Sequence, residues 1–198
     1  MAKITYSAKF DNVTSDLPRI NKVIAADMNE IKDSVNALYE SIGGWVDYED
    51  SATSATPINL TANVWTDLTN DKAGSGTITT YKPSFITGDL WNSASNSLDF
   101  TEVGSGRIMI VRNDFDITAG AANTRIDARL YFPDTAKSIE FMHDNIASNN
   151  DLVRYSRTTQ LFTFTDVLTS GCKIQVRADK SGATATVENF LITLISHF

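Results

Sequence analysis

The sequence has few of the residues on which disulfides, metal sites and membrane spans depend. One cysteine, Cys172, cannot form an internal disulfide, so the fold does not depend on one. Two histidines, His143 and His197, argue against most histidine-based metal and nucleophile sites. No window approaches the roughly 18 apolar residues of a membrane span. The first twelve residues also lack a signal-peptide core, so we expect neither membrane insertion nor Sec-type export.

Positive charge is also scarce, and hydroxyl groups are abundant. The net charge is −7, which argues against a nucleic-acid or phosphate-binding surface. The 198 residues include 18 Ser and 23 Thr, and 42% are hydrophobic. Threonine with aromatic residues favours strands, and serine, asparagine and glycine favour the turns between them. The length allows one folded domain plus an accessory segment.

Catalytic motifs are absent from the sequence. Gly74-Ser75-Gly76 and Gly104-Ser105-Gly106 lack the full nucleophile-elbow pattern and are expected to be hairpin loops. No phosphate-binding loop or dinucleotide fingerprint occurs. We expect His143 at the surface or in a turn, and Cys172 in the packing, although the neighbouring Lys173 could lower its pKa. The sequence therefore predicts no enzyme, no catalytic residues and no cofactor.

Two oxygen-rich stretches leave calcium open at this point. Asn113-Asp114-Phe115-Asp116 and Asn149-Asn150-Asp151 carry suitable ligand atoms, but neither matches an EF-hand loop. Ordinary turn chemistry accounts for both stretches, so no metal ligands are assigned.

A heptad pattern predicts one helix near the N-terminus. Apolar residues follow one another at spacings of 4, 3, 4, 3 and 4: Ile24, Met28, Ile31, Val35, Leu38 and Ile42. Met28, Val35 and Ile42 occupy one core position, and Ile24, Ile31 and Leu38 occupy the other. Gly43-Gly44 ends the pattern, as expected for a left-handed cap.

Two interpretations of this helix are open. A helix that packs on its own domain usually has a wide apolar stripe, whereas this stripe is narrow, as in a coiled-coil seam. Ala25, Lys32 and Tyr39 flank it on one side, and Asp27, Ser34 and Ser41 on the other. We favour a coiled coil in which these six residues form the oligomerisation site. Fewer than three heptads are marginal alone, so a larger oligomeric domain would have to support them.

The rest of the chain predicts an antiparallel β-sandwich. We expect an N-terminal arm at 1–23, the helix at 24–43, an acidic linker at 44–58 and the sandwich at 59–198. Turn residues separate the expected strands, which are 64–68, 77–81, 84–91, 97–103, 107–117, 124–132, 138–142, 152–164, 172–178 and 185–195.

The alternation along the strands predicts which faces are buried. In 125–132, Ile126, Ala128, Leu130 and Phe132 share one face. Residues 108–111 and 190–195 are instead apolar on both faces. A sandwich covers only one face of each sheet, so the second face of these strands needs the N-terminal segment or a neighbouring copy. We favour a neighbouring copy, because the helix already suggests self-association.

Two stretches resemble known families. Ile24-Ala25-Ala26-Asp27-Met28-Asn29-Glu30-Ile31-Lys32 resembles a segment found in phage fibre and other virion proteins, which implies a short trimeric coiled coil. Ser170-Gly171-Cys172-Lys173-Ile174-Gln175-Val176-Arg177, with the terminal strand 185–195, resembles trimeric jelly rolls of the tumour-necrosis-factor and complement-globular-head type. That second resemblance implies a terminal strand near a threefold axis.

Together these observations predict a mainly β, homotrimeric virion protein without enzymatic activity. The arm would attach to phage capsid or tail proteins, and the sandwich would face outward as a head fibre or capsid decoration. Aromatic residues in its loops (Trp65, Tyr81, Trp91 and Tyr155) could contact host-surface glycans, although Trp65 and Trp91 could instead belong to the core or to an interface. A tail-fibre tip and a non-viral carbohydrate-binding module are the alternatives. The expected location is the virion, assembled in the host cytoplasm.

Overall fold

The computed structural model describes residues 25–41, 43–163 and 171–195. The chain divides into two compact units, one that ends at Ile42 and one that begins at Gly43. No helix in the described part of the chain is long and apolar enough to cross a membrane.

The first unit contributes one described helix, α1 (Ala25–Ser41). Its bounds agree with the predicted 24–43 to within two residues, because the heptad spacing matches the helical repeat closely. Gly43 lies outside the helix and Gly44 begins the first strand, as the expected glycine stop implies.

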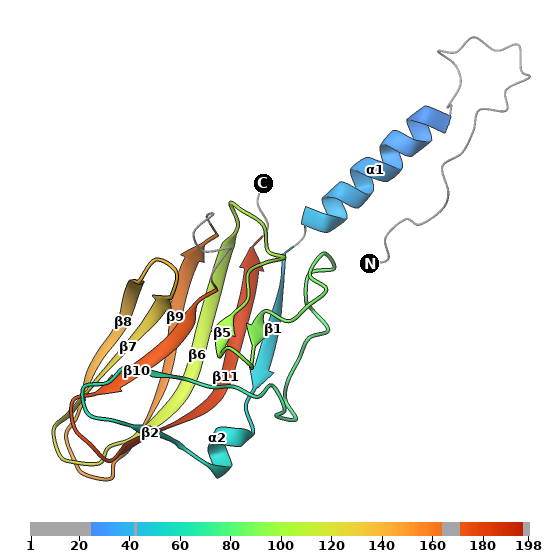
Figure 1. Cartoon of the computed structure of the whole chain (residues 1–198). Helices are drawn as coiled ribbons and strands as arrows, with labels where there is room; N and C mark the ends of the chain where they lie inside the picture. The colour runs from blue at the N-terminus through green and yellow to red at the C-terminus, as the bar shows by residue number, and fades with distance from the viewer. Residues whose placement is uncertain (1–24, 42, 164–170, 196–198) are drawn as a thin grey trace, which may run out of the picture. The chain divides into compact units, whose positions relative to one another are not determined.

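The second unit consists mainly of two antiparallel sheets (Figure 1). The first has the order β1-β11-β6-β9, with β2 beside β11, and the second has the order β3-β10-β7-β8. A separate hairpin pairs β4 with β5, and a short helix, α2 (Ala52–Ala55), follows β1. The strands are β1 (Gly44–Glu49), β2 (Ile58–Leu60), β3 (Thr66–Asp67), β4 (Trp91–Asn92), β5 (Ser97–Leu98), β6 (Ile108–Thr118), β7 (Thr124–Phe132), β8 (Lys137–Ile146), β9 (Leu152–Phe162), β10 (Lys173–Ala178) and β11 (Ala183–Ile195).

The strand order identifies the fold as a jelly roll. When the eight strands of the two main paths are numbered along the chain, one sheet has the order 1-8-3-6 and the other 2-7-4-5. Apart from strands 4 and 5 (β7 and β8), which pair as a hairpin in one sheet, successive strands pass from sheet to sheet in the two Greek keys of a jelly roll. The expectation of a mainly β, antiparallel jelly-roll sandwich is confirmed.

Side chains from both sheets fill the space between them. In β7, Ile126, Ala128 and Leu130 are fully buried and Phe132 nearly so, which confirms the predicted alternation. The largest side chain of the core is Trp91, whose ring packs edge-on against Phe190 at 4.7 Å. The core extends through the long strands β6, β9 and β11.

Residues 44–58 differ from the expected linker, because they supply β1, α2 and the first residue of β2. Val46 and Tyr48 are fully buried, and β1 pairs with β11 along its whole length. The strand is short, and the acidic, small residues that follow it hide its alternation. The sandwich therefore begins at Gly44 and not at residue 59.

The region between residues 64 and 103 holds less strand than expected. Only Thr66–Asp67, Trp91–Asn92 and Ser97–Leu98 are strands there. Side-chain oxygens of Asn92 and Asp99 accept hydrogen bonds from backbone N–H groups two residues ahead, both at 3.0 Å. Such local bonds replace ladder bonds, so the chain turns where its composition suggested strands.

Candidate functional site

The predicted oligomerisation residues lie on α1. Ile31 is 54% exposed and Val35 43% exposed, while Met28 is half-buried. Leu38 belongs to α1, but its side chain is outside the described set, and Ile24 and Ile42 lie outside the described residues. The described part of the stripe thus presents β-branched apolar side chains that the protein's own fold leaves accessible.

A second apolar surface lies on the outer face of the sheet β1-β11-β6-β9. Ile108 of β6 stands opposite Ile195 of β11 on one side and Phe162 of β9 on the other. Phe162 is 51% exposed, Ile195 is 38% exposed and Ile108 is half-buried. Ile110 occupies the next row of the same face. We call these four residues the apolar end of the sheet.

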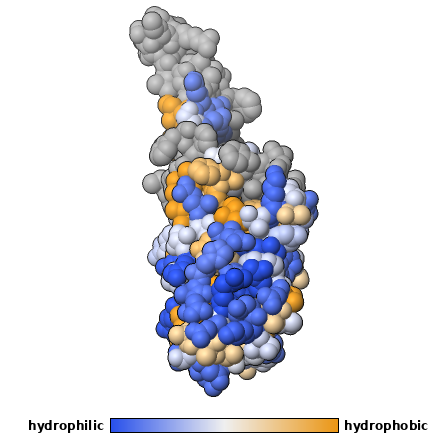
Figure 2. Space-filling view, turned by 90° about the vertical axis from the view of Figure 1, so that its left-hand side faces the viewer, coloured by the Kyte–Doolittle hydropathy of each residue, from blue (hydrophilic) through white to orange (hydrophobic). Residues whose placement is uncertain are grey.

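The apolar end confirms that these strands are apolar on both faces. Met109 and Val111 point into the core and are fully buried, whereas Ile108 and Ile110 point outward. Trp45, in the same row as Ile110, stacks on Tyr81 with ring centres 4.8 Å apart. In Figure 2, hydrophobic residues gather toward the upper end of the sandwich, where β9 ends in Figure 1, and hydrophilic residues cover most of the remainder of that view.

The middle of the same outer face is polar. Arg112 pairs with Asp114 at 2.9 Å, and Asn189 donates to Asp47 at 3.2 Å. Burial raises the pKa of Asp47, although the positive charge of Arg112 opposes this shift. One buried oxygen on each of Asp47, Asp114 and Asn189 has no hydrogen-bond partner among the residues that the structure describes. The sheet therefore changes from apolar to acidic along its length.

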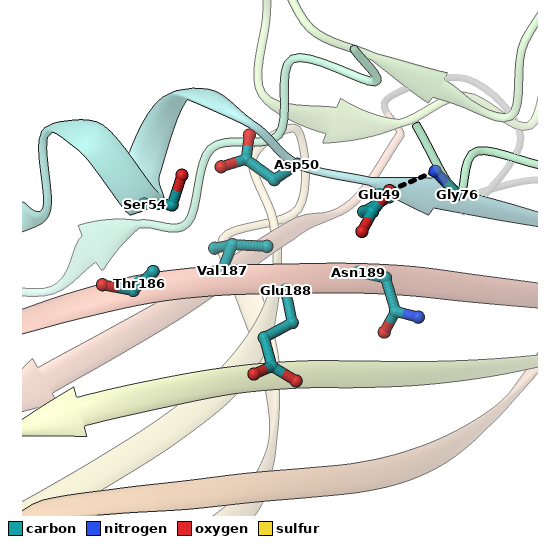
Figure 3. Close-up of a pocket in the computed structure, with 8 residues that line it drawn as sticks. All are labelled: Glu49, Asp50, Ser54, Gly76, Thr186, Val187, Glu188 and Asn189. Carbon is teal, nitrogen blue, oxygen red and sulfur yellow. Dashed lines mark hydrogen bonds between the residues drawn. The ribbon is translucent and has the colours of Figure 1, made fainter. Parts of the chain in front are cut away.

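A pocket of about 540 Å³ opens beside this polar region (Figure 3). It is lined by Glu49, Asp50, Ser54, Gly76, Thr186, Val187, Glu188 and Asn189. A β-bulge between Val187 and Asn189 locally shifts the pairing of β11 with β6.

The three carboxylates of the pocket already have partners. Glu49 accepts from the Gly76 N–H, and Glu188 pairs with Arg154 at 2.7 Å. Asp50, which is nearly buried, accepts from Thr53 and from the backbone of Asp71. All three carboxylates thus bind groups of the protein itself. Their role is to hold β1, α2 and β11 together. Among the pocket's described lining residues, no nucleophile is paired with a base.

Residues considered for chemistry lie apart from one another. His143 is exposed on β8, with Nδ1 2.7 Å from Asp127 and Nε2 3.1 Å from Glu140. Cys172 is fully buried, and burial raises the pKa of its thiol, so the neighbouring lysine does not activate it. Among the described residues, no group of three or more histidine, cysteine or acidic side chains is arranged to hold a metal ion.

The four aromatic residues considered for glycan contact divide into two pairs. Trp91 and Tyr155 belong to the core. The core alternative is therefore correct for Trp91, and the expectation of glycan contact is wrong for Tyr155. Tyr81 is exposed, and Trp65 is half-exposed over two arginines of the second sheet. Sequence reasoning missed this aromatic and basic cluster. Its signal was the shared face of residues 125–131 and 173–177, but only the strand register brings those two segments together.

No family model matches the sequence, and no curated protein matches it. Among solved structures, the chain is similar to the PRD1 vertex protein P5, with 13% identity, a TM-score of 0.39 and coverage of 80% of this chain and 98% of that one. It is also similar to murine APRIL, with 9% identity, a TM-score of 0.39 and coverage of 77% and 98%. The xylan-binding module CBM15 matches with 13% identity, a TM-score of 0.32 and coverage of 78% and 93%. The jelly-roll assignment rests on the strand order given above.

Proposed function

We propose that this chain is a non-enzymatic virion structural protein that works as a homotrimer. In this proposal it is a head fibre or a capsid decoration protein of a phage. Residues 1–23 attach it to the particle, and the jelly roll is displayed outward to adhere to the host surface. The observation that carries the proposal is the apolar end of the sheet, formed by Ile108, Ile110, Phe162 and Ile195.

The exposed area of these side chains is apolar surface that a neighbour could bury. Transfer of apolar area out of water contributes about 25 cal/mol per Å², so burial of these side chains against a neighbour is favourable. We assign the partner as further copies of the same chain, because α1 carries a second self-complementary surface. Ile31 and Val35 stand at successive core positions of a heptad pattern and are both exposed.

The number of copies is proposed from the resemblance of residues 24–32 to virion segments, because the heptad residues are of mixed type. Ile24, Ile31 and Leu38 occupy one core position, and Met28, Val35 and Ile42 the other. Isoleucine at both core positions favours trimers, whereas a β-branched residue at one and leucine at the other, as in Val35 and Leu38, favours dimers. Of these states, three copies agree with the virion segments that residues 24–32 resemble.

A short segment of chain connects the two exposed surfaces, the heptad residues of α1 and the apolar end of the sheet. Only Ile42 and Gly43 separate α1 from β1. The first residues of β1 pair with Leu194 and Thr193, next to Ile195 of the apolar end. Association of the helices and association of the sandwiches would therefore take place within one complex. Each association would raise the effective concentration for the other, which compensates for the short helix.

The mechanism that follows is multivalent binding. Three sandwiches on one stalk would present three copies of any contact surface. A weak single contact then becomes a strong attachment, because later contacts form within one complex. No bond-making step is required of the protein.

Copurification of the chain with phage particles tests the proposal. Phage particles purified from a lysate in which the chain is expressed should contain it, as detected by mass spectrometry. A variant without residues 1–23 should stay trimeric in solution and be missing from the particles. A chain found only in the soluble fraction, with or without residues 1–23, would contradict the virion assignment.

A tail-fibre tip is the alternative location within the same function. Gold-labelled antibody against the jelly roll distinguishes the two locations by electron microscopy. Label around the capsid supports the head assignment, and label at the tail end supports the alternative.

A further inference from the structure

The outer face of the sheet β3-β10-β7-β8 carries a cluster of aromatic and basic side chains. The guanidinium carbon of Arg129 lies 4.2 Å from the ring centre of Trp65 and 4.7 Å from that of Tyr131. The Nε of Arg129 donates to the Gln175 side-chain oxygen at 2.8 Å. The guanidinium carbon of Arg177 is also 4.5 Å from the Trp65 ring centre. These contacts hold the Arg129 side chain in one position and leave its two terminal nitrogens without a hydrogen-bond partner among the described residues.

Arg129 differs from the other cations of this face in its lack of a counter-ion. Arg177 pairs with Asp127 at 2.6 Å, and Arg125 lies 3.4 Å from the same carboxylate. Lys173 pairs with Asp67. Within the part of the chain that the structure describes, no carboxylate pairs with Arg129.

Two carboxylates that share the row of Arg129 in the sheet, those of Glu140 and Asp67, are already bound to other side chains. Glu140 is its cross-strand neighbour on β8, but the Glu140 carboxylate lies 3.1 Å from His143 Nε2. Asp67 binds Lys173 and accepts from the Gln175 amide at 2.7 Å. Burial lowers the pKa of Arg129, because partial removal of water from the guanidinium disfavours its charged form. A fixed arginine fork without a counter-ion is suited to an external oxyanion.

We propose that this cluster binds the oxyanion of an acidic saccharide, with the two terminal nitrogens of Arg129 donating to a carboxylate or a phosphate group. Trp65 then packs against the apolar face of the sugar ring, because it is half-exposed and adjoins the fork. This inference rests on the adhesion role proposed above and adds the class of ligand. Carboxylate and phosphate share the required geometry of two acceptor oxygens.

Isothermal titration of the full chain tests the inference with three probes. Trigalacturonate supplies carboxylates, mannose 6-phosphate supplies a phosphate, and galactotriose is a neutral reference. We expect one or both acidic probes to bind and galactotriose to bind more weakly. The stronger acidic probe identifies the source of the oxyanion. Absence of binding by both acidic probes, or equal binding of the neutral one, overturns the inference.

Two variants and one control connect the binding to the cluster. Arg129→Lys keeps the charge but removes the fork, and is expected to weaken acidic-probe binding about tenfold or more, as for loss of a charge-assisted hydrogen bond. Trp65→Leu tests the stacking surface independently, should the arginine variant fold poorly. Arg157→Lys is the matched control, since Arg157 lies 5.5 Å from the Tyr155 ring on β9. Equal effects of Arg129→Lys and Arg157→Lys overturn the inference.

Failure of this inference and failure of the proposed function give different results. If the chain is trimeric and found on particles but Arg129→Lys leaves saccharide binding unchanged, only the ligand assignment falls. If acidic probes bind through Arg129 but the chain is monomeric and absent from particles, the virion role falls and the saccharide site stands.

Discussion

Replacement of Ile31 by aspartate should weaken self-association if α1 holds the three copies together. Ile31 is at a core position of the heptad pattern and is 54% exposed in the single chain. Full burial of an isoleucine side chain is worth about 1.5–3 kcal/mol, so the half that is still exposed contributes about 1 kcal/mol per copy. Three copies lose about 3 kcal/mol, which is about a hundredfold in the association constant. Three carboxylates brought together in the seam add repulsion to this loss.

Sedimentation equilibrium over a range of protein concentrations measures this effect. Asp33→Lys is the matched control, because Asp33 is exposed on the same helix and belongs neither to the six heptad positions nor to the positions that flank them. We expect Ile31→Asp to shift the distribution toward monomer and Asp33→Lys to leave it nearly unchanged. Far-ultraviolet circular dichroism should show the same strand signal for both variants. Unchanged assembly of Ile31→Asp would refute the role of α1 in holding the three copies together.

Three further predictions concern the jelly roll. Phe162→Ser should lower the association constant of the trimer about a hundredfold, since each copy loses about 1 kcal/mol of apolar burial and three copies lose about 3 kcal/mol. Leu152→Ser, at the other end of β9, should leave the association constant unchanged. Similar effects of the two variants would argue against the apolar end as an interface. Burial alone would raise the pKa of Asp127, but hydrogen bonds, first that of Arg177, lower it. The carboxylate therefore stabilises the fold above its unfolded pKa of about 3.9, and this contribution is lost as pH falls through the lower folded value. In urea unfolding, Asp127→Asn should flatten the stability profile below about pH 4, and an unaltered profile would contradict this. Finally, Cys172 should react with iodoacetamide only in denaturant, because it is fully buried and burial raises the pKa of its thiol; rapid labelling of the native protein would be inconsistent with the core described.

The parts of the fold that could be predicted are those with a local signal. In β7, four alternating apolar residues fix both the strand and its buried face, and the predicted bounds 124–132 agree with the structure. The heptad spacing likewise predicted the position of α1 and its apolar stripe. In contrast, β1 is six residues long and its pairing with β11 joins positions about 145 residues apart, such as Val46 and Ile192. Local periodicity cannot reveal such a partner.

The candidate sites also divide into one that a local sequence pattern could predict and one that it could not. The outward apolar residues of β6 and β11 were visible as runs that are apolar on both faces, so an interface could be predicted there. The cluster around Arg129 was invisible, because it needs the register that sets Gln175 opposite Arg129 and the loop that brings Trp65 above them. The aromatic residues show the limit of composition: Trp91 and Trp65 have the same residue type, but one fills the core and the other lies on the surface.

The central claim is that three copies of this chain form one functional unit. Light scattering coupled to size-exclusion chromatography of the full chain measures its mass directly. We expect three times the chain mass of 21.7 kDa, which is about 65 kDa. A mass near 21.7 kDa across micromolar concentrations would contradict this claim, since neither α1 nor the apolar end of the sheet would then have its partner.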